Sequence, residues 1–347
     1  MKQKRISDFH MQIGTLEKGA LNKITDVAGV TVGHSTIKED KQNTGVTVIM
    51  PSKDNIYLNK MVAASYVSNG FGKTIGTIQL DELGTLETPI ALTNTLNAGL
   101  VADALIQYTI DRCKKDNYLA KTINPVVGEC NDHHFNNIQN RVVGYNNVMQ
   151  AIESASNDFE EGNVGAGTGT VCYGFKGGIG SASRTFELDG KKYTLGILVQ
   201  SNYGATVDLT VNGKNIGKKL SERTSGSECD KGSIIVIIAC DVPLTARQLK
   251  RVVKRCSVGI ARLGSYIGHG SGEVFIGFST ANIVTNNEKS DVINISCINE
   301  NKIDILFRAA GEATEEAILN SMICSEAATA LDGTRVESLR DYISEFI

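Results

Sequence analysis

The stretch "ECDKGSIIVIIACDVPL", residues 228–244, places a serine where the chain itself could react. Residues 234–239 are six consecutive apolar residues, a run typical of a fully buried strand, and the polar residues before them predict an exposed loop. The pair Gly232-Ser233 forms the boundary between the two. It is either a plain loop-to-strand junction or the point at which the chain is cut.

A serine hydroxyl becomes a good nucleophile only when a base takes its proton, and in N-terminal-nucleophile enzymes that base is the α-amine of the nucleophile itself. Attack of the Ser233 Oγ on the Gly232 carbonyl, followed by hydrolysis of the ester, would create this amine. Glycine leaves the approach unobstructed and accommodates a strained peptide. Because Gly-Ser pairs occur by chance in most chains of this length, the pair alone favours the plain junction.

The segment "ECNDHHFNN", residues 129–137, is the densest group of potential metal ligands, with Glu129, Cys130, Asp132, His133 and His134. Adjacent residues on a strand point to opposite faces, and no other segment has complementary ligand spacing. We therefore expect a polar active-site loop or a turn here, and no metal site.

Two glycine-rich runs resemble nucleotide-binding motifs, but both lack a required residue. In "GFGKT", residues 70–74, the glycine of a phosphate loop five positions before Gly72 is replaced by Val67. In "VGAGTGTVCYG", residues 164–174, Thr170 stands where the last glycine of a dinucleotide fingerprint belongs. No cofactor is expected.

The elements that must position Ser233 alternate irregularly between strands and helices. Before the Gly-Ser pair, the sequence predicts an antiparallel pair and a later strand, with two helices between them: strands 30–37, 43–52 and 191–204, helices 94–113 and 141–155. After it, the sequence predicts helix 243–264, capped by Thr245 and Gln248, strands 272–280, 292–299 and 301–310, and helix 312–331. This order favours a layered α+β architecture over a doubly wound parallel sheet.

The composition excludes several classes of protein. The chain has 347 residues, 41% of them apolar, and a net charge of −3, which gives no electrostatic case for binding nucleic acid or an anionic membrane. No segment is long and apolar enough for a signal peptide or a membrane span, so a cytoplasmic location is expected. The eight cysteines form no CxxC pair, which favours buried free thiols.

Over residues 19–333 the chain resembles the self-processing DmpA family, the L-aminopeptidase/D-amidase/esterases that include the β-peptidyl aminopeptidases. The resemblance rests on the order and spacing of "ITDVAGVTVGH", "NTGVTVI", "NGFGKTIGTIQLDELGTLETPIALTNTLNAG", "PVVGECND", "VGAGTGTVCYGFKGGIGSASR", "LVQSNYG", "GSIIVIIACDVPL" and "GHGSGEVFIGFST". It implies an αββα sandwich like that of N-terminal-nucleophile hydrolases. It also implies a single domain that is cut before Ser233, into chains 1–232 and 233–347.

The resemblance assigns roles to individual residues. Ser233 corresponds to the nucleophile, Ser271 and Glu273 to the Ser-x-Glu motif, and Asn202 to the asparagine that stabilises the oxyanion. Residues two apart on a strand share a face, so the side chains of the Ser-x-Glu motif can reach one site. The family also uses a tyrosine near the scissile carbonyl. This chain has none in "GECND", where Asn131 is the expected substitute as hydrogen-bond donor.

The predicted function is release of N-terminal residues from small peptides, amides or esters through an acyl-enzyme, by a homo-oligomer of four or more cut protomers. Two alternatives stay open at this point. Ornithine acetyltransferases share a related self-processing fold, but their nucleophile is threonine and this chain has "KGSII". The second alternative is a homologue that never cuts itself and serves as a binding protein. It would give a single band on a gel, whereas the self-cut peptidase and the self-cut acetyltransferase would each give two.

Overall fold

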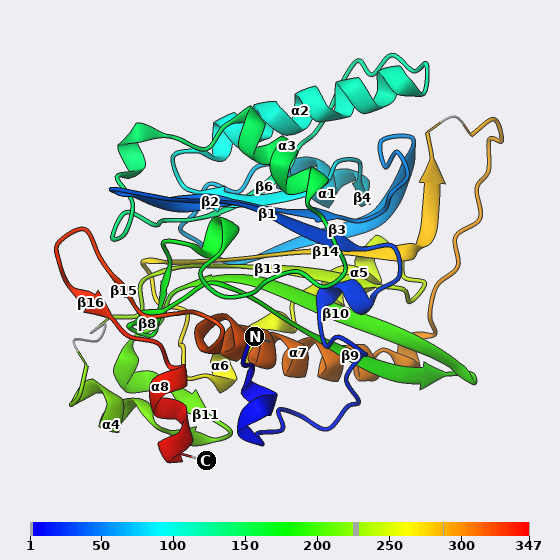
Figure 1. The fold of residues 1–347 in the computed structure, drawn as a ribbon. Helices are drawn as coiled ribbons and strands as arrows, with labels where there is room; N and C mark the ends of the chain where they lie inside the picture. The colour runs from blue at the N-terminus through cyan, green and yellow to red at the C-terminus, as the bar shows by residue number, and fades with distance from the viewer. Residues whose placement is uncertain (1–2, 225–228, 287, 347) are drawn as a thin grey trace.

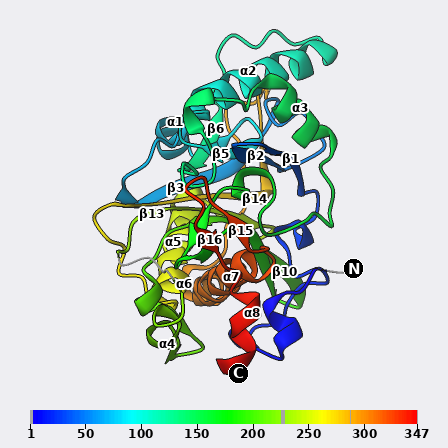
Figure 2. The ribbon, with the colours of Figure 1, turned by 60° about the vertical axis from the view of Figure 1, so that its left-hand side comes forward.

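The computed structural model describes residues 3–224, 229–286 and 288–346, and its core is a pair of stacked sheets with helices on both outer faces. From top to bottom, Figure 1 shows a helical layer, a smaller sheet, a larger sheet and a second helical layer. The view in Figure 2, turned by 60°, keeps the same four layers. The expected αββα sandwich is therefore confirmed.

The smaller sheet has the strand order β1-β2-β5-β6. The antiparallel pair expected near residues 30–52 is confirmed as β1 (Thr31–Glu39) and β2 (Gln42–Met50). Next to it, β5 (Ile90–Asn94) runs parallel to β6 (Val126–Cys130). The outer face of this sheet is covered by α2 (Ala98–Lys115) and α3 (Tyr145–Glu153), which correspond to the two helices expected before the Gly-Ser pair.

The larger sheet has the strand order β4-β3-β14-β13-β10-β9. Its strands are β4 (Thr85–Leu86), β3 (Asn59–Gly70), β14 (Ser271–Thr285), β13 (Gly232–Cys240), β10 (Lys191–Asn202) and β9 (Ile179–Leu188). The strand that begins at the Gly-Ser pair, β13, lies in the middle, parallel to β14 and antiparallel to β10. The outer face of this sheet is covered by α5 (Ala246–Val253), α6 (Cys256–Arg262) and α7 (Asp304–Ile323).

The apolar run of β13 is continuous because both of its faces are buried. Ile235 and Ile237 point into the core between the two sheets, whereas Ile234 and Val236 point into the core between the larger sheet and its helices. A strand that is covered on both faces requires apolar residues at every position. The prediction of a fully buried strand after Ser233 is confirmed.

The remaining elements are short. Within the described residues they comprise α1 (Thr77–Leu83), α4 (Gly217–Ser221), α8 (Arg340–Ile343), the hairpins β7 (Val171–Cys172) with β8 (Phe175–Lys176), β11 (Thr210–Val211) with β12 (Lys214–Asn215) and β15 (Ala328–Thr329) with β16 (Arg335–Val336), and seven short 3-10 turns.

Four of the expected elements after β13 differ from the structure in type, continuity or extent. Residues 243–264 form two helices, because the chain turns after α5 and brings Gly259 of α6 against the backbone of α7. The capping box of Thr245 and Gln248 is confirmed, with reciprocal hydrogen bonds of 3.2 Å. Residues 292–299 form no strand, and residues 301–310 lead into and begin α7, which ends at Ile323 and not at residue 331.

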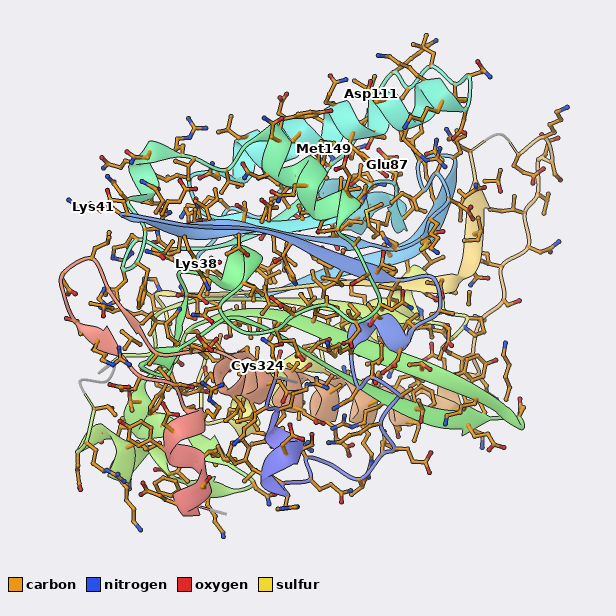
Figure 3. All side chains as sticks on the ribbon, viewed as in Figure 1. Lys38, Lys41, Glu87, Asp111, Met149 and Cys324 are labelled. Carbon is orange, nitrogen blue, oxygen red and sulfur yellow. The ribbon has the colours of Figure 1, made fainter. Side chains whose placement is uncertain are left out.

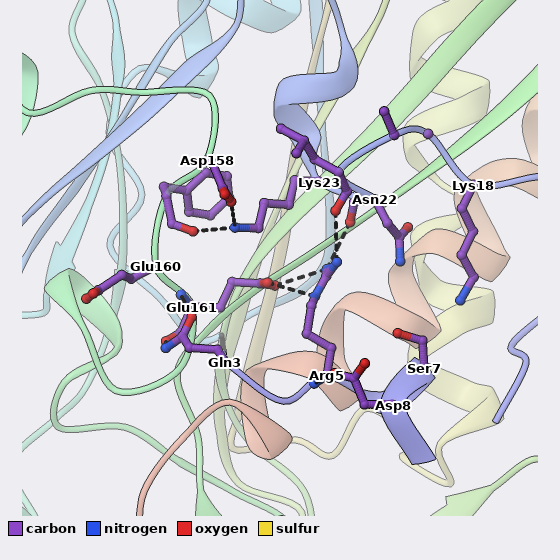
Figure 4. A pocket seen from close by; sticks show the side chains of 14 residues that line it. Gln3, Arg5, Ser7, Asp8, Lys18, Asn22, Lys23, Asp158, Glu160 and Glu161 are labelled. Atoms are coloured by element: carbon purple, nitrogen blue, oxygen red, sulfur yellow. Dashed lines mark hydrogen bonds and ion pairs between the residues drawn. The ribbon is translucent and has the colours of Figure 1, made fainter. Parts of the chain in front are cut away.

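The N-terminal segment is fixed to the body of the protein by a charge network around a cavity of about 500 Å³, shown in Figure 4. The guanidinium of Arg5 pairs with Glu161 at 2.8 Å and donates to three backbone carbonyls. Lys23 pairs with Asp158 at 2.6 Å, and Lys18 pairs with Glu316 of α7 at 2.7 Å. Because all three cations have carboxylate partners, the network holds the segment in place.

Candidate active site

The expected site residues gather where β13 and β14 begin and β10 ends, at the left-hand end of the larger sheet in Figure 1. Ser233 lies directly opposite Asn202 on β10 and opposite Gly272 on β14. Residues directly opposite in an antiparallel pair point to the same face of the sheet. The structure therefore brings the side chains of Ser233 and Asn202 together, on the face toward the smaller sheet.

Gly232 has a backbone conformation that favours glycine, with φ at +113°. A Cβ atom at this position would lie 2.0 Å from the carbonyl oxygen of Asn202, closer than any side chain can approach. The Ser233 hydroxyl donates a hydrogen bond of 2.6 Å to the Gly232 carbonyl oxygen. The nucleophile expected from the sequence thus contacts the carbonyl group that it would have to attack.

The orientation of the Asn202 amide follows from its hydrogen bond. The backbone N–H of Val171 donates to Asn202 Oδ1 at 2.9 Å, so this atom must be the oxygen and the other must be the NH₂ group. Among the described residues the NH₂ group has no acceptor. It is free to donate to an oxyanion that develops beside Ser233.

Ser271 and Glu273 lie on the face of β14 opposite to that of Gly272. A Cβ atom on Gly272 would be 3.0 Å from the Ser233 Oγ, so it is Gly272 that faces the expected nucleophile. The Ser271 hydroxyl donates to Glu273 Oε1, so these two side chains share a face of the strand and contact each other. Neither has a hydrogen bond to the Ser233 side chain among the described residues. The pair lies beside the peptide backbone at residues 232–233, because Ser271 is the register partner of Gly232.

Burial raises the pKa of Glu273 to about 7, the hydrogen bond from Ser271 opposes this rise, and the charge of Asp230 adds to it. Its Oε2 atom is buried and has no hydrogen-bond partner among the described residues. With the chain intact, this carboxyl group is therefore much easier to protonate than an ordinary glutamate.

Asn131, the expected substitute for the family tyrosine, is exposed, and its side chain stabilises a turn. Its side-chain oxygen accepts from the backbone N–H of His133 at 3.0 Å. The residue beside the nucleophile is instead Cys130, whose Sγ lies 3.5 Å from the Ser233 carbonyl oxygen. Burial holds the pKa of this thiol well above its usual range, so it packs against the strand as a neutral group.

Sequence reasoning considered Glu129 only as a metal ligand, and the structure shows it as a buried carboxylate next to Gly72, whose neighbour Phe71 packs against Gly272. Its two oxygens accept from the backbone N–H of Lys73, at 2.8 Å, and from the Thr95 hydroxyl. Both donors, a backbone N–H and a hydroxyl, are neutral groups. A glutamate at the end of the buried run "PVVGEC" is the signal that could have indicated it.

Two further findings concern ligands and membranes. Across residues 3–224, 229–286 and 288–346, no three His, Cys, Asp or Glu side chains converge as metal ligands. In this same part of the chain no helix combines the length and the apolar character that crossing a membrane requires.

Known proteins resemble this chain over nearly its whole length. Residues 22–336 match the model of the family described as peptidase family S58. The beta-peptidyl aminopeptidase BapA of Sphingosinicella microcystinivorans is 36% identical over 349 residues, covering 92% of this chain and 86% of that protein.

Solved structures extend the match to the fold. A Pyrococcus horikoshii OT3 protein is 44% identical, with a TM-score of 0.94 over 99% of this chain and 98% of the other. The Ochrobactrum anthropi l-aminopeptidase d-ala-esterase/amidase is 34% identical, with a TM-score of 0.90 over the same shares, and represents a variant of the Ntn hydrolase fold.

Proposed function

The chain belongs to peptidase family S58 and is an aminopeptidase or amidase of the N-terminal-nucleophile class, and we propose that Ser233 is its nucleophile, exposed when the chain cuts itself after Gly232. The contact of 2.6 Å between the Ser233 hydroxyl and the Gly232 carbonyl oxygen is the observation that carries the proposal. The positive φ of Gly232, a conformation that favours glycine, supports it further.

Self-cleavage proceeds in two steps. The Ser233 Oγ bonds to the Gly232 carbonyl carbon, and the bond from this carbon to the Ser233 nitrogen breaks, which leaves an ester and a free amine. Water then hydrolyses the ester, giving the carboxylate of Gly232 and the hydroxyl of Ser233. The two resulting chains, 1–232 and 233–347, remain parts of one domain.

In the mature enzyme the α-amine of Ser233 takes the Oγ proton while the hydroxyl attacks the substrate carbonyl. The NH₂ group of Asn202 holds the oxyanion, and water releases the acyl group from the serine. An α-amine has a pKa of about 7.7–8.0, so it is mostly protonated at pH 7. Ser271 and Glu273, beside the cut bond, orient this amine and influence its charge.

The substrates are peptides, amides or esters with a free amino group at the acyl end. The buried carboxylate of Glu129, whose partners are neutral donors, receives the substrate ammonium. The names of the relatives point to aminopeptidase activity on α- or β-amino acid residues. Acetyl transfer is not favoured, because residue 233 is serine and the relatives with named activities are aminopeptidases.

An acyl-enzyme trapping experiment tests the nucleophile. Rapid acid quenching during turnover of a β-alanyl or L-alanyl ester should raise the mass of fragment 233–347 by one acyl residue, on the peptide that begins with Ser233. Adducts confined to fragment 1–232 would contradict the assignment.

A cytoplasmic location and an assembly of four or more cut protomers stay predictions. Size-exclusion chromatography with light scattering checks the assembly.

A further inference from the structure

Lys176 is a completely buried lysine that the proposed mechanism does not use. Its Nζ atom lies 4.5 Å from the ring centre of Phe135 and has no carboxylate within ion-pair distance among the described residues. Burial lowers the pKa of this amine to about 7, an effect strengthened by the charge of Lys38 and opposed by that of Asp132. Because a buried amine without an ion pair is costly, its remaining contacts indicate what it does.

The Nζ group of Lys176 donates to the backbone carbonyl of Thr170. This carbonyl already accepts the N–H of Gly177 at 3.1 Å, so the lysine is not required to satisfy it. The same peptide unit presents the N–H of Val171 on its other side, and this N–H donates to Asn202 Oδ1. One rigid peptide plane therefore joins the lysine to the proposed oxyanion amide.

A two-residue hairpin produces this arrangement. Tyr173 and Gly174 both have positive φ, at +50° and +78°, as a type I′ turn requires. The turn folds β8 back onto β7 and pairs Lys176 directly with Val171. In the sequence "TVCYGFKGG" the lysine is thus brought back beside the peptide that holds Asn202.

We propose that Lys176 is a positioning residue for the Asn202 amide: its hydrogen bond to Thr170 fixes and polarises the Thr170–Val171 peptide, which in turn orients Asn202 toward the oxyanion. Hydrogen bonds in such a chain strengthen one another in a buried site. The inference rests on the proposed role of Asn202 as oxyanion donor. It predicts that Lys176 acts on catalysis only through that side chain.

A double-mutant cycle tests this coupling, with kcat and KM referred to the amount of cut chain. Asn202→Ala should lower kcat about 10²-fold, and Lys176→Met should lower it about 10-fold with KM almost unchanged. In the Asn202→Ala background, Lys176→Met should change kcat by less than about 2-fold, because its route of action is already lost. Lys41→Met is the matched control and should leave kcat at the wild-type value, since this exposed lysine, labelled in Figure 3, lies in the turn between β1 and β2.

The possible failures are distinguishable. If Asn202→Ala leaves kcat intact or changes only KM, the role of Asn202 in the proposed function is wrong. If Asn202→Ala behaves as expected but Lys176→Met has no effect, or an effect that simply adds to it, the positioning role is overturned. Should Lys176→Met not fold, Lys176→Gln takes its place, because it keeps a donor and should give a smaller loss of kcat with the same non-additivity.

Discussion

Glu273 is the site residue whose charge state depends most on its surroundings. Its pKa is raised to about 7 by burial, so the folded protein binds a proton at this carboxyl group more tightly than the unfolded chain does. By linkage, the free energy of unfolding contributed by this group is fully present below the pKa of an ordinary glutamate, about 4.3, and is lost as the pH rises toward 7.

Glu273→Gln should remove this pH dependence. The comparison is made in the uncut Ser233→Ala background, so the two proteins differ only at residue 273. In this background the charge of Asp230 still contributes to the raised pKa of Glu273. The glutamine variant should gain stability relative to its parent as the pH rises from about 5 to 8, measured as the difference in Tm. A difference in Tm that stays constant over this range would contradict the account.

At the residue scale, the family resemblance identified Ser233 and Asn202, and the strand register explains why they meet. The sequence could not show that Ser271 and Glu273 lie on the other face of β14, because that depends on which residue pairs with Ser233 across the sheet. The assignment of Asn131 as a hydrogen-bond donor stays a prediction, and the residue that contacts Ser233 was not foreseen. Cys130 contacts Ser233 because β6 points it between the sheets, whereas Asn131 already lies in a turn.

At the element scale, the start of β13 depends on Gly232. The close approach of the Asn202 carbonyl and the positive φ together exclude a side chain there. Gly232→Ala should therefore leave most of the chain uncut and lower its Tm, because the scissile peptide can no longer occupy its place between β10 and β14. Denaturing gel electrophoresis of freshly purified protein measures the uncut fraction.

Gly213→Ala is the matched control for this substitution. Gly213 also has a positive φ, +76°, but a Cβ there would meet no atom within 4 Å. It should cost about 1 kcal/mol of stability and leave cutting unchanged. Cutting of the Gly232→Ala variant at the wild-type rate would show that the backbone at this position does not matter for scission.

The same scale shows where sequence patterns mislead. The segment "NKIDILFRAA" was expected to form a strand, yet its residues lead into and begin α7. The deeply buried positions are Ile303, Leu306, Ala309 and Ala310, which follow a helical period. A short apolar run fits both periods, and only packing against β9 and β10 decides between them.

At the scale of the whole molecule, the two predicted chains share the larger sheet and its helical layer. Strands β13 and β14 lie between β3 and β10, so fragment 233–347 is inserted into fragment 1–232. Arg184 of β9 is fully buried and pairs with two carboxylates of α7, Glu312 at 3.3 Å and Glu316 at 2.8 Å. Neither fragment has a complete core, so they should separate only in denaturant.

Arg184→Met should weaken the association of the two fragments strongly, by about 3–5 kcal/mol, because it leaves the buried carboxylate of Glu312 without a cation and that of Glu316 with Lys18 alone. Arg223→Met is the matched control: its ion pair with Glu345 also joins the two fragments but is solvent-exposed. Removing it should have little effect. Urea unfolding of the cut proteins measures both, and equal midpoints for the two variants would contradict this account of the interface.

Self-cleavage by Ser233 is the central claim, and the intact mass of purified protein tests it most directly. The wild-type chain should give two species, 1–232 and 233–347, and Ser233→Cys should keep some scission, because a thiol can make the same acyl shift. Ser233→Ala should stay a single species of 347 residues without peptidase activity. An external protease would be nearly indifferent to the loss of one hydroxyl. Scission of Ser233→Ala at the same bond and rate as the wild type would therefore contradict the assignment of Ser233 as the self-processing nucleophile.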